Sequence, residues 1–250
     1  MTPAKNCEGA PRRARWTREM RVLVTRPLHD AQRTAERLVA GGHQAVIDPV
    51  LVIEPVQFEL PEETAAIAIT SANVFHAVPQ SVLAPLFKRP LFAVGAHSAA
   101  AAAAFGFQDT QAAAGDAYSL ARLLIDKLSF GTRVLYLAGA ERAHDLAALV
   151  RGAGIEVEIR VVYRAVPAGR LQEKTLTLLA AGEIGAVLHY SARSAGIFLH
   201  LVDEAGLREA AGRARHICIS NAVAEPLERA GLATEAPPRP SEDALFALLR

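Results

Sequence analysis

The 250-residue chain has few cysteines, few aromatic residues and no long apolar run. Cys7 and Cys218 are its only cysteines, so the sequence offers no disulfide framework and favours a reducing, cytoplasmic location. Its longest apolar runs fall well short of the roughly 20 residues that a membrane-spanning helix needs. No apolar segment of the secretory type precedes the first expected strand. We therefore expect neither a disulfide-rich secreted protein nor a membrane protein.

The motifs of several common enzyme classes are also missing. Neither G-x-G-x-x-G nor G-x-x-x-x-G-K-[ST] occurs, so the usual phosphate-binding loops of nucleotide enzymes are absent. There is no G-x-S-x-G, and neither cysteine lies in a catalytic motif. The 8 histidines lack the paired spacing of metal ligands, and no expected strand ends in clustered aspartates. We expect no cofactor, no metal site and no activated nucleophile.

Positive charge is concentrated in the first twenty residues, MTPAKNCEGAPRRARWTREM. Five basic residues against two acidic ones leave +3 there, so the rest of the chain carries −2 of the formal net charge of +1. This balance weighs against a nucleic-acid-binding surface. We expect residues 1–20 to be a disordered tail, or residues 1–19 to precede the true start at Met20. An arm that binds nucleic acid or a partner is the alternative.

From Arg21 onward, short apolar runs alternate with amphipathic segments, a pattern typical of the doubly wound α/β class with parallel sheets. The expected strands cover 21–25, 67–70, 91–95, 133–139, 157–166, 186–191 and 216–220, with an extended stretch at 44–56 and weaker strands near 109–112 and 233–236. The expected helices cover 30–40, 97–105, 116–127, 141–152, 171–181, 192–203, 221–230 and 241–249.

The chain contains an internal repeat of about 110 residues. RVLVTRP at Arg21 matches RVLYLAG at Arg133, which lies 112 residues further on, and AIAITSANVF matches AVLHYSARSAGIF. The matching segments are 21–56 with 133–168, 66–75 with 186–198, and 92–107 with 217–232. Each copy has the size of a small five-stranded domain.

Two such units favour a ligand cleft between them, lined by residues that follow the strands. Helix N-termini there suit a ligand with carboxylates or phosphates. The alternative is that the small polar residues only cap helices. The candidates are Thr25, Arg26, Thr70, Ser71, Asn73, Gly95, His97, Ser98, Gly139, Glu141, Arg142, Ser191, Arg193, Ser194, Ser220 and Asn221.

Several short segments form a recognisable set: VLVTRP at 22–27, ITS at 69–71, AVGAHSA at 93–99, LAGAERAHDLAALVRGAG at 137–154 and VVYRAVP at 161–167. Together they resemble the uroporphyrinogen-III synthase family over residues 21–250. The chain departs from the family's Ile-Gly-x-x-Thr-Ala, because it reads Ile219-Ser220-Asn221-Ala222-Val223-Ala224. The chain lacks the threonine of that pattern, so at this helix start only the backbone N–H groups remain to bind a ligand.

The resemblance implies two flavodoxin-like domains joined by a two-stranded β connector. One domain would combine 21–50 with 168–250, and the other would span 57–158. The connector strands would be 51–56 and 159–167, which are extended and bounded by proline.

The resemblance also implies the activity, that of a lyase that cyclises linear hydroxymethylbilane to uroporphyrinogen III with loss of water and inversion of ring D. This implies a cytoplasmic monomer of heme biosynthesis, free of cofactors, nucleic acid and membranes, that receives its substrate from hydroxymethylbilane synthase. Tyr163 is the candidate proton donor, and packing of its ring is the alternative. Tyr190 and His97 are lesser candidates for contact with the substrate. A non-catalytic two-domain binding protein for a polyanionic small molecule is the competing hypothesis.

Overall fold

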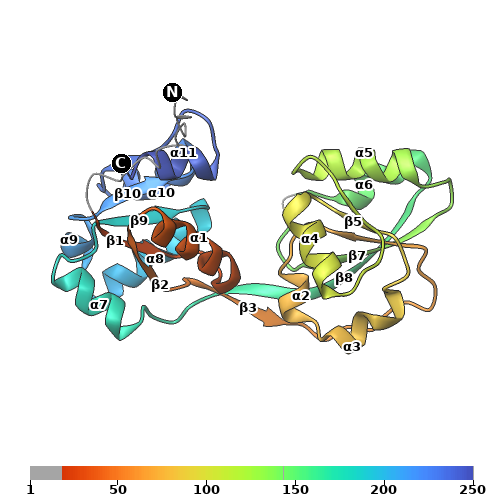
Figure 1. Cartoon of the computed structure of the whole chain (residues 1–250), viewed down its shortest axis with the longest axis horizontal. Helices are drawn as coiled ribbons and strands as arrows, with labels where there is room; N and C mark the ends of the chain where they lie inside the picture. Colours follow the sequence, from red (N-terminus) through yellow and green to blue (C-terminus); the bar gives the residue numbers. More distant parts are fainter. Residues whose placement is uncertain (1–18, 143, 250) are drawn as a thin grey trace, which may run out of the picture. The chain divides into compact units, whose positions relative to one another are not determined.

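Two sheets, each covered by helices on both faces, make up the part of the chain that the computed structural model describes, residues 19–142 and 144–249. The chain divides into two compact units, which Figure 1 shows. The first contains the described residues up to Val52 and from Pro167 onward, and the second contains Ile53–Val166. The prediction of a basic tail concerns residues 1–20, of which 1–18 lie outside the described residues.

The first unit has a five-stranded parallel sheet. Its strands are β1 Arg21–Val24, β2 Gln44–Ile47, β9 Ala186–His189, β10 Arg215–Cys218 and β11 Thr234–Glu235, in the spatial order β11-β10-β9-β1-β2. Its helices are α1 Leu28–Ala40, α7 Glu173–Ala180, α8 Ala192–Glu204, α9 Arg208–Ala211, α10 Asn221–Arg229 and α11 Glu242–Ala247. Strands from the two ends of the chain meet at the centre of the sheet, where Val22 of β1 pairs with Ala186 of β9.

The second unit has a six-stranded sheet. Its strands are β3 Leu51–Pro55, β4 Ala66–Ile69, β5 Leu91–Ala93, β6 Thr110–Ala112, β7 Arg133–Gly139 and β8 Glu156–Pro167, in the order β3-β8-β7-β4-β5-β6. Its helices are α2 Val74–Ala77, α3 Gln80–Leu83, α4 Ala96–Phe105, α5 Ala117–Lys127 and α6 Leu146–Val150, with the 3-10 helices η1 Ala84–Leu86 and η2 Arg151–Ala153.

Strand β3 and the C-terminal part of β8 form a two-stranded antiparallel ladder where the chain passes between the units. The N–H of Val56 donates to the carbonyl of Val162 at 2.9 Å, and the N–H of Ala168 donates to that of Val50 at 2.9 Å. Partner numbers fall along one strand as they rise along the other, which defines antiparallel pairing. The α/β class with parallel sheets and a two-stranded connector is thus confirmed.

The internal repeat explains the arrangement of both sheets. The series β2-β1-β9-β10-β11 has the order 2-1-3-4-5 of a flavodoxin-like sheet, counted along the chain. The series β8-β7-β4-β5-β6 matches it strand for strand when its strands are numbered by their counterparts in the repeat. Each sheet takes two of these strands from one copy of the repeat and three from the other. The copies therefore exchange strands, and neither repeat forms a sheet by itself.

Apolar residues fill both faces of each sheet. In β4, Ile67 and Ile69 pack with Phe75 on one face, whereas Ala68 packs with Leu120 on the other. Successive side chains of a strand point to opposite faces, so a strand with helices on both sides is apolar throughout. Strand β1 divides its side chains between two clusters of the first unit in the same way. Within the described residues, no helix is long and apolar enough to cross a bilayer.

One local expectation is wrong, and some short elements are not predicted. The helix expected over 141–152 begins only at Leu146, because the carboxylate of Asp145 accepts the N–H of Ala148 at 3.2 Å and caps it there. The stretch 44–56 is extended as expected, and it contains two strands, β2 and β3, which belong to different sheets. The sequence also does not predict α2, α3 and α9, since helices of four residues are too short to show a period of 3.6.

Candidate active site

The carboxyl ends of β4 and β7 place several predicted residues at one edge of the second sheet. Parallel strands end on the same side, so Thr70 and Ser71 lie near Gly139. The hydroxyls of Thr70 and Tyr136 are 2.9 Å apart and hydrogen-bond to each other. The Ser71 hydroxyl accepts the N–H of Asn73 at 3.2 Å, so it shapes the turn that leads into α2. This edge therefore gathers hydroxyl groups from two neighbouring strands.

Tyr163 reaches this edge because β8 has an irregular register. Ala138 pairs with Val161 but Gly139 pairs with Tyr163, so β8 carries one extra residue there. Such a bulge redirects a side chain. It brings the Tyr163 ring against Gly139, where a Cβ would lie 2.8 Å from the ring atoms Cε2 and Cζ. Glycine at position 139 is required by this close approach, and the two residues form one structural feature.

The environment of Tyr163 keeps its hydroxyl protonated. The residue is only 9% exposed, and this burial raises the pKa of Tyr163 above its ordinary value of 10, against the opposite effect of hydrogen bonds with Ser71 and Asn73. Glu141 adds a smaller effect that raises the pKa further. A neutral phenol at pH 7 can donate a proton to a hydrogen bond but cannot act as a base.

The loop after β7 carries Glu141 and Arg142, both exposed. One guanidinium nitrogen of Arg142, Nη1, donates to the carbonyl oxygen of Gly139 at 3.1 Å. Since an arginine has five N–H donors, this one bond does not exhaust its capacity to bind an anion. Arg142 is therefore oriented by the same glycine that accommodates Tyr163.

The turn from β5 to α4 lies at the same edge. Gly95 is the N-cap of α4, and a Cβ at Gly95 would lie 3.6 Å from the Cα of Gly115, in ordinary contact. His97 is exposed, whereas Ser98 is only 6% exposed and faces the core. The structure thus leaves His97 and the backbone of Gly95 accessible to a ligand and buries the side chain of Ser98.

In the first unit, the carboxyl ends of β1 and β9 carry Thr25, Arg26 and Tyr190. Thr25 is 1% exposed and donates to the carbonyl of Leu188 at 3.1 Å, a structural role. Arg26 lies over the Tyr190 ring, 4.1 Å from its centroid. Its Nη1 is 3.1 Å from Oε1 of Glu242. Burial raises the pKa of Tyr190 to about 12, and the carboxylate of Glu242 adds to this effect.

The remaining predicted residues begin α8 and α10. Ser191 caps α8, because its hydroxyl accepts the N–H of Ser194 at 3.1 Å and donates to the Ser194 hydroxyl at 2.9 Å. Ser194 is 4% exposed, whereas Arg193 is exposed. Ser220 is the N-cap of α10 and Asn221 its first residue. The capping interpretation therefore holds for Ser191, while Arg193 and Asn221 face solvent.

Several residues at these edges are absent from the sequence-based candidates. Tyr136 lies within a buried strand. A buried tyrosine hydroxyl usually has a hydrogen-bond partner, and this could have identified Tyr136 as a candidate from the sequence. Thr34 and Arg37 lie one turn apart on α1, and both contact Glu242. No local pattern links α1 to Glu242, because the contact joins opposite ends of the chain.

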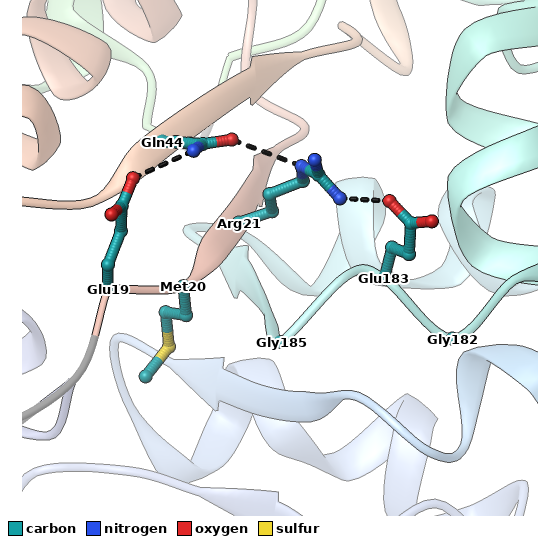
Figure 2. Close-up of a pocket in the computed structure, with 7 residues that line it drawn as sticks. All are labelled: Glu19, Met20, Arg21, Gln44, Gly182, Glu183 and Gly185. Atoms are coloured by element: carbon teal, nitrogen blue, oxygen red, sulfur yellow. Dashed lines mark hydrogen bonds and ion pairs between the residues drawn. The ribbon is translucent and has the colours of Figure 1, made fainter.

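A hollow of about 460 Å³ lies elsewhere, at the amino edge of the first sheet, and Figure 2 shows it. Its polar groups pair with one another: Arg21 with Glu183, Nε of Arg21 with Oε1 of Gln44 at 3.1 Å, and Nε2 of Gln44 with Oε1 of Glu19 at 2.7 Å. Ligands of parallel sheets bind at the opposite edge. In residues 19–142 and 144–249, no group of three His, Cys, Asp or Glu is placed to hold a metal ion.

Comparison with known proteins agrees with this architecture. The model of the family "Uroporphyrinogen-III synthase HemD" matches residues 32–247. The structure of uroporphyrinogen-III synthetase from Helicobacter pylori is similar, with 20% identity, coverage of 92% of this chain and 98% of that chain, and a TM-score of 0.61. A mutant uroporphyrinogen III synthase from Thermus thermophilus is 17% identical over 92% of this chain and 96% of that chain, with a TM-score of 0.48. No curated protein sequence matches.

Proposed function

Since this chain belongs to the uroporphyrinogen-III synthase HemD family and has that enzymatic function, we propose that it is a lyase whose substrate is hydroxymethylbilane. The substrate is a linear tetrapyrrole that carries carboxylate side arms and a terminal hydroxymethyl group. Its closure to uroporphyrinogen III releases that hydroxyl as water and inverts ring D. The observation that carries this proposal is the family match over 32–247, most of the chain.

The chemistry requires guidance more than activation. The hydroxymethyl pyrrole ionises readily because the ring nitrogen supports the resulting cation, and the departing hydroxide takes up a proton to become water. The last ring must then attack at its substituted carbon, because unguided closure gives the symmetrical type I isomer. We assign most of the catalytic effect to positioning and electrostatics, which need no nucleophile or metal.

Tyr163 is our candidate for the group that assists the leaving hydroxyl. It is a neutral phenol whose ring lies against Gly139, and Ser71 and Asn73 are near enough to influence its pKa. A donor in a mostly buried place forms a stronger hydrogen bond than one in water. Because the substrate supplies much of its own driving force, this donation should contribute about ten- to a hundredfold to the rate.

The carboxylate arms require positive groups and N–H donors. Arg142 and Arg193 are exposed at the carboxyl edges of their own sheets. Helices α4, α8 and α10 begin at these edges, and their first N–H groups suit carboxylates. We propose that His97 and the backbone of Gly95 in the second unit, and Asn221 and Arg26 in the first, add further contacts to these arms.

The instability of the substrate also bears on partners and location. Hydroxymethylbilane closes by itself to the type I isomer, so transfer from hydroxymethylbilane synthase should be rapid, and we propose a transient handover between the two enzymes. The chain has only 2 cysteines, which suits the reducing cytoplasm where we place it. We further propose that it acts as a monomer.

The test is to supply purified protein with hydroxymethylbilane formed in situ and to separate the oxidised porphyrin isomers by chromatography. We expect the type III isomer to dominate, and a reaction with heat-denatured protein to give type I. Type I alone from the folded protein would contradict the proposed substrate and reaction.

A further inference from the structure

Four donors of the first unit converge on one carboxylate, that of Glu242 at the start of α11. Oε1 accepts from Nη1 of Arg26 at 3.1 Å and from the Tyr190 hydroxyl at 3.1 Å. The Thr34 hydroxyl shares its one proton between the carbonyl oxygen of Asp30 at 3.0 Å and Oε1 of Glu242 at 3.3 Å. Oε2 accepts from Nη1 of Arg37 at 2.6 Å. Two guanidinium groups and two hydroxyls around one carboxylate make a complete recognition site for that group.

This cluster lies where a ligand is expected in such a sheet. Arg26 follows β1 and Tyr190 follows β9, the neighbouring central strands. The strand order reverses between these two strands, since β2 lies beyond β1 and β10 beyond β9. Ligands of open parallel sheets bind at the carboxyl edge at this reversal. In this protein that place is taken by a side chain of the protein itself.

The donors are held in position by contacts other than those with Glu242. The guanidinium of Arg26 stacks on Tyr190 at 4.1 Å and lies 3.4 Å from a carboxylate oxygen of Asp30. The guanidinium of Arg37 stacks on Phe246 at 4.4 Å. The Glu242 side chain is 29% exposed, so solvent and solutes reach it. The binding geometry would therefore persist if this carboxylate were replaced by another.

We infer that Arg26, Thr34, Arg37 and Tyr190 form a subsite for one carboxylate arm of the substrate, and that Glu242 occupies this subsite until the substrate displaces it. The inference rests on the proposed function, which supplies a ligand with several carboxylate arms. Glu242 then acts as an internal competitor. The apparent affinity of the subsite for substrate then equals its intrinsic affinity multiplied by the fraction of time that Glu242 leaves the subsite vacant.

The alternative is that Glu242 only fastens α11 to α1. Asp243 provides a matched control, because it forms an ion pair with the same Arg37 from the same helix but is 89% exposed and lies outside the cluster around Oε1. A fastening role predicts that Glu242→Gln and Asp243→Asn differ only in melting temperature. An occupied subsite predicts that they differ in substrate affinity.

The first experiment measures KM and kcat of the full chain with hydroxymethylbilane formed in situ, with melting temperature from circular dichroism. Glu242→Gln keeps the shape and the hydrogen-bond acceptor but removes the charge, so we expect KM to fall about three- to tenfold at an unchanged kcat. Asp243→Asn should change KM much less, because Asp243 pairs with Arg37, whereas Glu242 is also contacted by Arg26 and Tyr190. A Glu242→Gln enzyme whose KM is unchanged or raised would overturn the inference.

A second variant connects the effect to the subsite. Arg26→Gln introduced into the Glu242→Gln enzyme should cancel the gain in KM, because the group freed by the first substitution is removed by the second. If the double variant kept the lower KM, the gain would come from outside this cluster, and the subsite would be wrong.

A binding measurement keeps this inference separate from the proposed reaction. Mellitate, benzenehexacarboxylate, is a probe with clustered carboxylates, and calorimetry at low salt measures its affinity without turnover. Glu242→Gln should bind mellitate about three- to tenfold more tightly than the unsubstituted protein. Equal affinity would overturn the subsite. If no type III isomer formed but mellitate bound as expected, the proposed reaction would fail and the subsite would stand.

Discussion

Substituting Ala for Gly139 tests whether the position of the Tyr163 ring limits the reaction. The added Cβ would lie 2.8 Å from Cε2 and Cζ of Tyr163 and 2.9 Å from its hydroxyl oxygen. Ordinary contact begins at 3.4 Å, so the ring must move by about 0.6 Å or the end of β7 must yield. The substitution thus displaces the candidate donor without changing its chemistry.

The size of the effect follows from that displacement. A misplacement of about 1 Å can lower a rate by about 10²-fold, so a shift of about 0.6 Å predicts a kcat lower by about tenfold. Overpacking should reduce the free energy of unfolding by about 1–3 kcal/mol. We expect KM to change less than kcat, because the carboxylate arms are bound by other residues.

The assay follows the type III isomer from hydroxymethylbilane formed in situ, with urea unfolding of the same preparations. Gly152→Ala in η2 is the matched control, because a Cβ there meets nothing within 4 Å. It adds the same methyl group to the same unit and should leave kcat unchanged.

A double-variant cycle tests whether Gly139→Ala lowers kcat through the Tyr163 hydroxyl. In a Tyr163→Phe enzyme, Gly139→Ala should still lower stability but should lower kcat no further, since the displaced ring no longer carries a donor. A further tenfold loss of kcat in that background would refute a route through the Tyr163 hydroxyl. An unchanged kcat for Gly139→Ala alone, in a folded protein, would refute the premise that the ring position matters.

Other predictions concern single groups. Tyr163→Phe should lower kcat about ten- to a hundredfold, ~1.4–2.7 kcal/mol, with little change in melting temperature, and a folded but wholly inactive variant would mean that one donor carries the reaction. Arg142→Ala should raise KM in a salt-sensitive way, by a factor that corresponds to ~0.2–1 kcal/mol of binding free energy. An unaltered KM at low salt would mean that Arg142 does not contact the substrate and only donates to the carbonyl at the end of β7. Val161→Pro removes an N–H inside β8 and should unfold the protein or abolish type III selectivity, which circular dichroism and isomer chromatography distinguish. Burial, and the imidazole of His216 at 3.0 Å, hold the pKa of His189 well below 6.5. Below about pH 6.5 the imidazole of His189 is protonated in the unfolded chain but stays neutral in the folded protein, so the free energy of unfolding should fall as the pH falls. Urea titrations should show this decrease, and it should be less steep in His189→Leu.

The sequence by itself determined the elements and the class of fold. Strand 66–69 is apolar throughout, and strand 186–189 is apolar except for its last residue. Helices cover both faces of each sheet, so the buried strands are visible in the sequence as runs of apolar residues. The repeat and the family resemblance also come from the sequence alone. The prediction of a helix start was less accurate where one capping side chain determines it. Asp145 caps α6, so this helix begins at Leu146.

Only the tertiary structure decided which residues meet. The repeat shows two similar copies, but pairing of β1 with β9 and of β4 with β7 depends on which edges pack together, which no local period records. The bulge that brings Tyr163 onto Gly139 shifts the register of β8 by one residue, and this register depends on the pairing of β8 with β7.

The cluster around Glu242 shows the same limit most clearly. Arg26 and Glu242 are separated by almost the whole chain, and each by itself reads as an ordinary surface charge. Local propensity and periodicity act over a few residues and therefore specify helices and strands. Contacts between distant segments depend on how the covered sheets assemble, and the carboxylate subsite exists only after that assembly has taken place.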